Sequence, residues 1–115
     1  MGSSVYSVTI DCADPKGLAS FWEQVLDYKR THDGDEEVVI EPRSGSGDAL
    51  LFLEVPDVKQ VKNRIHFDLK PTDQAAEVER VKKLGATEVD IGQGDVTWVV
   101  LADPEGNEFC ILRPR

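Results

Sequence analysis

The chain has 115 residues, with 22 acidic and 13 basic side chains and a formal net charge of −9. This length suits one domain, and 40% hydrophobic with 30% charged residues is typical of a chain that buries a core. The acidic balance and the lack of a basic cluster exclude nucleic acid and anionic membrane surfaces as partners, because both require grouped Lys and Arg. The apolar runs are too short to span a bilayer, and two cysteines do not make a disulfide scaffold. We therefore expect a single soluble, cytoplasmic domain over residues 1–115.

The first half of the chain predicts a strand, a helix and three strands. Residues 5–12 alternate apolar and polar side chains, the pattern of a half-buried strand. Asp14-Pro15 suits the start of a helix, apolar residues at three- and four-residue spacing continue to Leu26, and Asp27 tolerates the left-handed conformation common at a helix exit. After the helix we expect, in order, a hairpin of strands 28–31 and 37–41 around a turn at 32–35, a loop at 42–48 and a strand at 49–55.

The second half repeats this plan. Asp73 stands 59 residues after Asp14, and His66 stands 59 residues after Ser7, which indicates an internal repeat. We expect, in order, a strand at 64–70, a helix from the cap at 72–73 to Gly85, strands at 86–91 and 96–102, a turn at 103–107 and a strand at 108–113. The fold class is therefore α+β, with one βαβββ module at about 4–55 and a second at about 64–113.

The alternation also assigns the side chains of each strand to two faces. The apolar faces of the two leading strands, Val8 to Cys12 and Ile65 to Leu69, are expected to lie under the helices. The opposite faces carry polar groups such as Ser7, His66 and Asp68 among apolar ones, which is the composition of a small-molecule cleft.

Three segments carry a resemblance to a known family: Asp14-Pro15 leading to Phe21-Trp22, Arg64 to Leu69, and Asp103 to Phe109. In these segments the chain resembles the vicinal oxygen chelate superfamily of glyoxalase I, bleomycin-resistance proteins and extradiol dioxygenases, and more narrowly the bacterial glyoxalase-like domains. The resemblance implies two βαβββ modules that form a curled mixed sheet around a shared cleft, and a homodimer. Because the superfamily includes lyases, dioxygenases and non-catalytic drug-binding proteins, the fold alone does not select a function.

The resemblance also implies where a metal would be held. Metalloenzymes of this superfamily place ligands on the first and last strands of each module, and those positions fall on Ser7, His66, Cys110 and Glu54, or on Phe52 in another register. Cys110 stands where many members carry a ligating Glu. His, Glu and Cys suit zinc, whereas Ser is a poor ligand. We therefore expect no cofactor; the alternative is one divalent ion (Zn, Ni, Fe or Mn) held by His66, Glu54 and Cys110.

His66 is the candidate catalytic residue, as a ligand or a general base near neutral pH, although it also suits a structural bond to Asp68. Cys110 is either a thiol contact or a small buried hydrophobe. Phe52 and Trp98 either stack on a planar ligand or pack within the sheet. The predicted ligand-binding residues are Ser7, Phe52, Asp68, Trp98 and Cys110.

Three functions follow from these residues. The first is a metal-free small-molecule-binding protein that sequesters a hydrophobic or cationic ligand such as an antibiotic, because an acidic cleft favours cations. The second is a divalent-metal-dependent lyase or isomerase of the glyoxalase type. The third is a non-catalytic dimeric interaction module.

Overall fold

The computed structural model describes residues 2–115, which divide into two compact units. The first unit extends to Val58 and the second runs from Lys59 to Arg115. This boundary lies within the connection expected between the two modules. Neither helix of residues 2–115 is long and apolar enough to cross a membrane.

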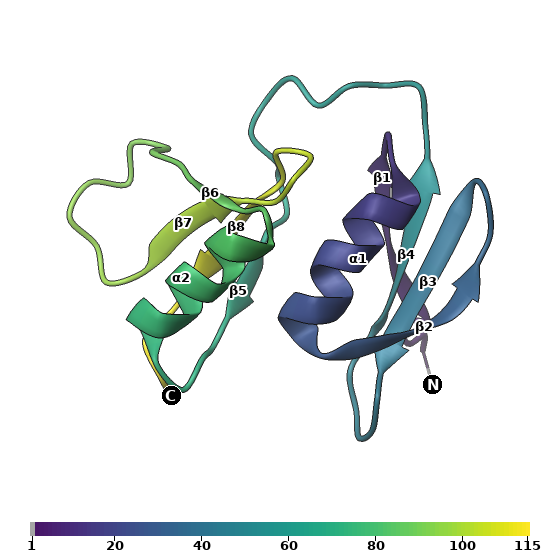
Figure 1. The fold of residues 1–115 in the computed structure, drawn as a ribbon, viewed down its shortest axis with the longest axis horizontal. Coiled ribbons are helices and arrows are strands. Elements are labelled where there is room, and N and C mark those ends of the chain that lie inside the picture. Colours follow the sequence, from purple (N-terminus) through teal and green to yellow (C-terminus); the bar gives the residue numbers. More distant parts are fainter. Residues whose placement is uncertain (1) are drawn as a thin grey trace. The chain divides into compact units, whose positions relative to one another are not determined.

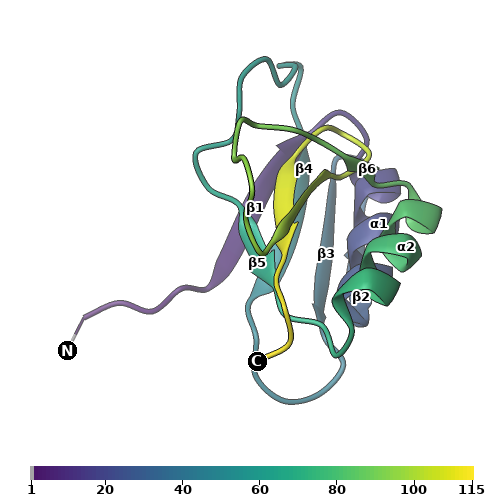
Figure 2. The ribbon, with the colours of Figure 1, turned by 90° about the vertical axis from the view of Figure 1, so that its left-hand side faces the viewer.

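The first unit is a four-stranded mixed sheet with one helix against it (Figure 1). The strand order is β1-β4-β3-β2, in which β1 and β4 are parallel and the other neighbours are antiparallel. In Figure 2, α1 lies on one side of the strands of its sheet. The elements are β1 (Ser7–Cys12), α1 (Pro15–Leu26), β2 (Tyr28–Asp33), β3 (Glu37–Pro42) and β4 (Ala49–Glu54).

Both predicted ends of α1 are confirmed. The Asp14 carboxylate accepts the backbone N–H of Gly17 at 3.1 Å, which caps the helix, and Pro15 occupies its first position. Asp27 ends the helix with φ 56°, the left-handed conformation. Between these ends Phe21 and Trp22 are 2% exposed, and their rings pack edge to face at 5.2 Å.

The sheet of the first unit buries one face and leaves the other partly open. Leu50 and Phe52 of β4 lie with the fully buried Val38 and Ile40 of β3 in the core, whereas Leu51 and Leu53 point to the opposite side and are only half-buried. We call the side opposite the helix the open face. Of the two roles given for Phe52, the structure shows packing within the sheet and not contact with a ligand, because the residue is 0% exposed and belongs to the core.

The second unit repeats the same topology. Its sheet has the order β5-β8-β7-β6, again with a parallel pair at one edge, β5 and β8. The helix begins after the capping carboxylate of Asp73 and ends at Gly85, as predicted. The elements are β5 (Phe67–Leu69), α2 (Gln74–Leu84), β6 (Thr87–Glu88), β7 (Val99–Ala102) and β8 (Glu108–Ile111).

Several strands differ from their predicted extents. The strand expected at 64–70 covers only Phe67–Leu69, and Ile65, expected under a helix, is 79% exposed. The reason lies before β5, where the Glu108 side chain accepts the backbone N–H of Asn63, so the chain is held by a side chain instead of a strand ladder. In the first unit, residues 32–33 belong to β2 and not to the turn, and the ladder shifts register next to them.

The internal repeat holds in the strand register. In the first unit Val8 lies opposite Leu50 and Ile10 opposite Phe52; adding 59 to each number gives the pairs of the second unit, Phe67 with Phe109 and Leu69 with Ile111. The counterpart of Cys110 in the first unit is therefore Leu51. The position in the fourth strand that corresponds to Cys110 was expected at Glu54, or at Phe52 in another register; the observed register places it at Leu51.

Candidate functional site

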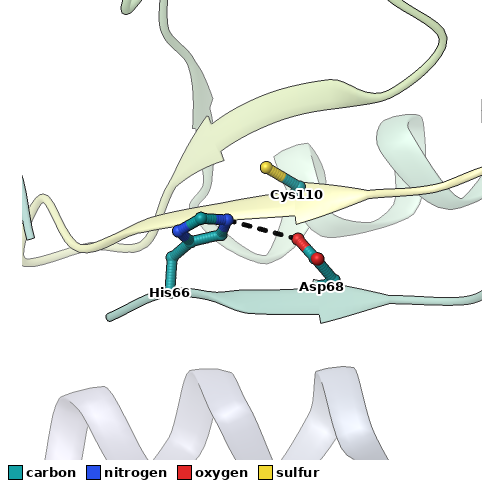
Figure 3. A group of neighbouring side chains, drawn as sticks. All are labelled: His66, Asp68 and Cys110. Atoms are coloured by element: carbon teal, nitrogen blue, oxygen red, sulfur yellow. Dashed lines mark ion pairs between the residues drawn. The ribbon is translucent and has the colours of Figure 1, made fainter. Parts of the chain in front are cut away.

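Three side chains with metal-binding or acid–base chemistry meet on the open face of the second unit (Figure 3). His66 directly precedes β5, Asp68 lies within β5, and Cys110 lies in the neighbouring β8. One donor atom from each lies within 4.8 Å of the others. The closest pair is His66 Nε2 and Asp68 Oδ1, at 3.3 Å. Among the residues that the structure describes, this is the one such group of three.

The fold fixes this arrangement through the strand period and the register. Asp68 lies in β5 and His66 directly precedes it, and their 3.3 Å contact shows that the two side chains point to the same side (Figure 3). The parallel ladder places Asp68 directly opposite Cys110. The alternate residues Phe109 and Ile111 are 0% exposed on the other side of the sheet, in the core with α2. The buried apolar face therefore determines which side the three donors occupy.

The thiol is buried while the other two groups reach solvent. Cys110 is 4% exposed, whereas the side chains of His66 and Asp68 are 37% and 54% exposed. Burial raises the pKa of the Cys110 thiol, the Asp68 carboxylate raises it further, and the positive charge of Lys62 opposes this. The thiol is therefore protonated at neutral pH, and a reactive nucleophile is not its role without a metal.

The donor set fits a divalent ion. Zinc binds imidazole nitrogen and carboxylate oxygen at about 2.0–2.2 Å and thiolate sulfur at about 2.3 Å, so tetrahedral donors stand roughly 3.3–3.8 Å apart. The distance between His66 and Asp68 already satisfies this, and the Cys110 sulfur lies within 4.8 Å of both donor atoms. Three protein ligands leave a coordination position for water or a ligand.

A second set of contacts holds the chain that leads into the site. Glu108, on the same strand face as Cys110, accepts the backbone N–H of Asn63 at 3.0 Å and pairs with Lys59 Nζ at 3.1 Å. Asn63 also donates its side-chain amide to Asn107 at 2.9 Å. We call residues 59–63 the strap. These bonds tie the strap to the start of β8, two residues before Cys110.

The other predicted site residues lie elsewhere. Ser7 begins β1 and is half-buried, and Glu54 ends β4 and is exposed; both belong to the first unit. Trp98 is 40% exposed and stands two residues before Val100, the β7 partner of Cys110. Neither cysteine forms a disulfide, and the Cys12 thiol donates to the backbone carbonyl of Leu53 at 3.6 Å.

Sequence reasoning missed Lys62 and used a misleading register for the fourth strand. Nothing in the local sequence marks Lys62, since it acts on Cys110 from the strap. The 59-residue spacing already present in the sequence would have led from Cys110 to Leu51 instead of Glu54. The contact between His66 and Asp68, raised as a possibility from their spacing, is confirmed.

The fold and the three donors define a class: an α+β protein of two similar modules, with a group of side chains that could hold a metal ion in one of them. The model of the glyoxalase-like domain family matches residues 7–112, so the chain belongs to that family. No curated protein matches the sequence.

Several solved structures have a similar fold. A glyoxalase/bleomycin resistance/dioxygenase family enzyme from Burkholderia phytofirmans has a TM-score of 0.73 at 17% identity, covering 96% of this chain and 98% of that one. The fosfomycin resistance protein FosX from Mesorhizobium loti has a TM-score of 0.71 at 17% identity, covering 97% and 92%. An E126Q mutant of FosX from Listeria monocytogenes, in complex with Mn(II) and 1S,2S-dihydroxypropylphosphonic acid, has a TM-score of 0.71 at 19% identity, covering 100% and 93%.

Proposed function

We propose that the protein binds a small molecule at the open face of its second unit, through one divalent metal ion held by His66, Asp68 and Cys110. The observation that carries this proposal is that an imidazole, a carboxylate and a thiol lie within 4.8 Å of one another on one side of the second sheet. Three unlike donors at this spacing suit a borderline-soft ion and leave an open coordination position. The E126Q mutant of FosX from Listeria monocytogenes, which has a similar fold, was solved in complex with Mn(II) and a small diol phosphonate. This supports a site that binds a metal ion and a small molecule together.

When bound, the ion would supply Lewis-acid polarisation of a ligand oxygen. The chain's own residues have other roles. The 3.3 Å contact between Asp68 and His66 holds the carboxylate and the imidazole close together before an ion binds, and the buried Cys110 supplies the third donor from the neighbouring strand. Trp98, with 40% of its surface exposed, is proposed as the ring on which an apolar part of the ligand stacks.

The test is metal content. We expect untagged protein purified without chelator to hold close to one divalent ion per chain by elemental mass spectrometry, or to gain one, with a thermal shift, when Zn, Ni, Fe or Mn is added back. His66→Ala should abolish this. His32→Ala is the matched control, because His32 is also exposed and contacts a carboxylate, Glu37, at 3.7 Å, but lies in the first unit. Absence of metal, with no shift on add-back, would contradict the proposal.

A second candidate function is metal-free sequestration of a cationic ligand. The charge distribution favours it: the part of the chain up to Val58 has twelve acidic and four basic side chains, a net charge of −8. Such a field attracts cations and is screened by salt. We expect hydrophobic cations to stabilise the protein in the presence of a chelator, with an effect that weakens as ionic strength rises. Equal stabilisation by neutral analogues would contradict this candidate.

The homodimer implied by the resemblance is also proposed. Ile65 and Val61, beside the site, are 79% and 76% exposed, as expected for residues that a second copy covers. Light scattering of the purified chain should give twice the mass of 12.8 kDa. A concentration-independent monomer would contradict it.

A further inference from the structure

We propose that Cys110 makes the site selective for thiophilic divalent ions, zinc together with its substitutes cobalt and cadmium, over manganese. This inference rests on the proposed function, because it names the kind of ion that the same site takes. It concerns one residue of the chain, and its test separates the two ideas.

The argument begins with the donor atoms. Carboxylate and water suit Mn(II), whereas thiolate selects softer ions such as zinc. His66 and Asp68 fit either kind of ion, so Cys110 is the ligand that discriminates.

The second step is rigidity. Cys110 is 4% exposed and sits within the ladder, opposite Asp68 on one side and Val100 on the other. Its short side chain has a single rotatable bond to sulfur, so the sulfur cannot withdraw far from the site. His66 and Asp68 are more exposed and can adjust around it. An ion that enters this group must therefore accept sulfur as a ligand.

The third step is that the corresponding pair in the first unit has neither the carboxylate nor the thiol. The counterparts of Asp68 and Cys110 under the 59-residue register are Thr9 and Leu51. A threonine hydroxyl and a leucine side chain do not reproduce this pair of donors. Thiophilic selectivity is therefore a property of the second unit.

The experiment is titration of the full chain with Co(II), Cd(II), Zn(II) and Mn(II), observed by near-ultraviolet absorption and by competition. Cys12→Ala is the background, since it removes the other thiol, which is also buried, and leaves Cys110 as the only sulfur besides Met1. We expect a sulfur-to-metal charge-transfer band that saturates at one Cd(II) or Co(II) per chain. We also expect Mn(II) to bind at least about tenfold more weakly, since even second-shell changes alter affinity 10–100-fold.

Cys110→Asp on this background should abolish the band and raise the affinity for Mn(II) relative to Cd(II) by about tenfold or more. If this variant does not fold, the band and the ion ranking of the Cys12→Ala chain decide alone. One bound Cd(II) without a charge-transfer band, or Mn(II) binding as tightly as Zn(II), would overturn the selectivity while leaving the proposed metal site intact. Failure of every ion to bind would overturn both.

Discussion

The two units share a topology and a strand register but differ in what they carry. All four strands of the first sheet have six residues, whereas those of the second have between two and four. The first helix buries two aromatic rings, and the second buries only Val78 and Val81. The donor group, in contrast, lies wholly in the second unit. The first unit therefore has the larger hydrophobic core, and the second unit has the three donor side chains.

The charges follow the same division. The first unit carries a net charge of −8, and the second, with ten acidic and nine basic side chains, carries −1. A near-neutral second unit imposes little long-range field of its own on the site, so binding there depends on local donors. The following predictions test this comparison, from the largest expected effect to the smallest.

Trp22→Ala should destabilise the chain by about 3–5 kcal/mol, because it empties a large buried volume and removes the ring contact with Phe21. Trp98→Ala is the matched control and should cost less than about 1 kcal/mol, since that ring is 40% exposed. Urea denaturation followed by circular dichroism measures both. Similar costs for the two tryptophans would contradict a core concentrated in the first unit.

Asp103→Ala should cost about 2–4 kcal/mol, by removing a buried acceptor in the second unit. The carboxylate is in a residue only 4% exposed and accepts the backbone N–H groups of Glu105 and Asn107 and the side-chain amide of Asn107. The control Asp95→Ala changes an exposed residue in a loop and should stay within about 0.5 kcal/mol. Equal losses of stability for Asp103→Ala and Asp95→Ala would contradict a stabilising role of this turn in the second unit.

Glu108→Gln should remove about 1–2 kcal/mol of stability near neutral pH, because the strap loses its charged partner. Burial would raise the pKa of Glu108, but hydrogen bonds from the Asn63 backbone and from Lys59 more than offset it, so the pKa lies below its ordinary 4.5. A lowered pKa stabilises the fold above pH 4.5, and this stability disappears as the pH falls through the folded-state value.

The measurement is the unfolding free energy of both proteins between pH 7 and pH 3. We expect the wild type to lose stability more steeply than Glu108→Gln below pH 4.5, so that the two curves approach each other. Parallel curves over this range would contradict the role of Glu108 in holding the strap.

Asp27→Gly should stabilise the chain by about 0.5 kcal/mol, because the residue ends α1 at φ 56°, where glycine has no steric cost. Its counterpart, Gly85, has φ 125°, and Gly85→Ala should destabilise by about 1 kcal/mol. Thermal unfolding of the two variants measures a gain in one unit and a loss in the other. A loss for Asp27→Gly would mean that its exposed ion pair with Arg43 outweighs the backbone term.

The helices and their ends could be predicted from the sequence because their signals are local. Asp14, Pro15 and Asp27 determine the start and end of one helix, and Asp73 and Gly85 those of the other. Strand extents could not be predicted in the same way, because a strand exists only where a partner backbone accepts it. Ile65 illustrates this: its apolar side chain fits the alternating pattern, but its backbone lies outside β5 and its side chain is exposed.

The sequence likewise predicted the residues of the candidate site better than it predicted how they come together. His66 and Asp68 follow from spacing along one strand, and Cys110 from its distance to the preceding turn. Their meeting depends on a pairing between strands about 40 residues apart, which the sequence indicates only through the repeat. Whether Phe52 contacts a ligand or packs within the sheet could not be decided from the sequence, because β4 is apolar on both sides and its alternation carries no signal.

Each unit closes by pairing its first strand with its last, Ser7 beside Ala49 and Phe67 beside Phe109, 42 residues further along the chain in both cases. During synthesis β1 leaves the ribosome long before β4 exists, while α1 and the β3–β4 pair can form from nearer contacts. We therefore expect the leading strand to be incorporated late in folding. Until that moment it is an unpaired edge, and a fusion tag placed close to Ser7 would slow the closing step of folding and leave the earlier ones unchanged.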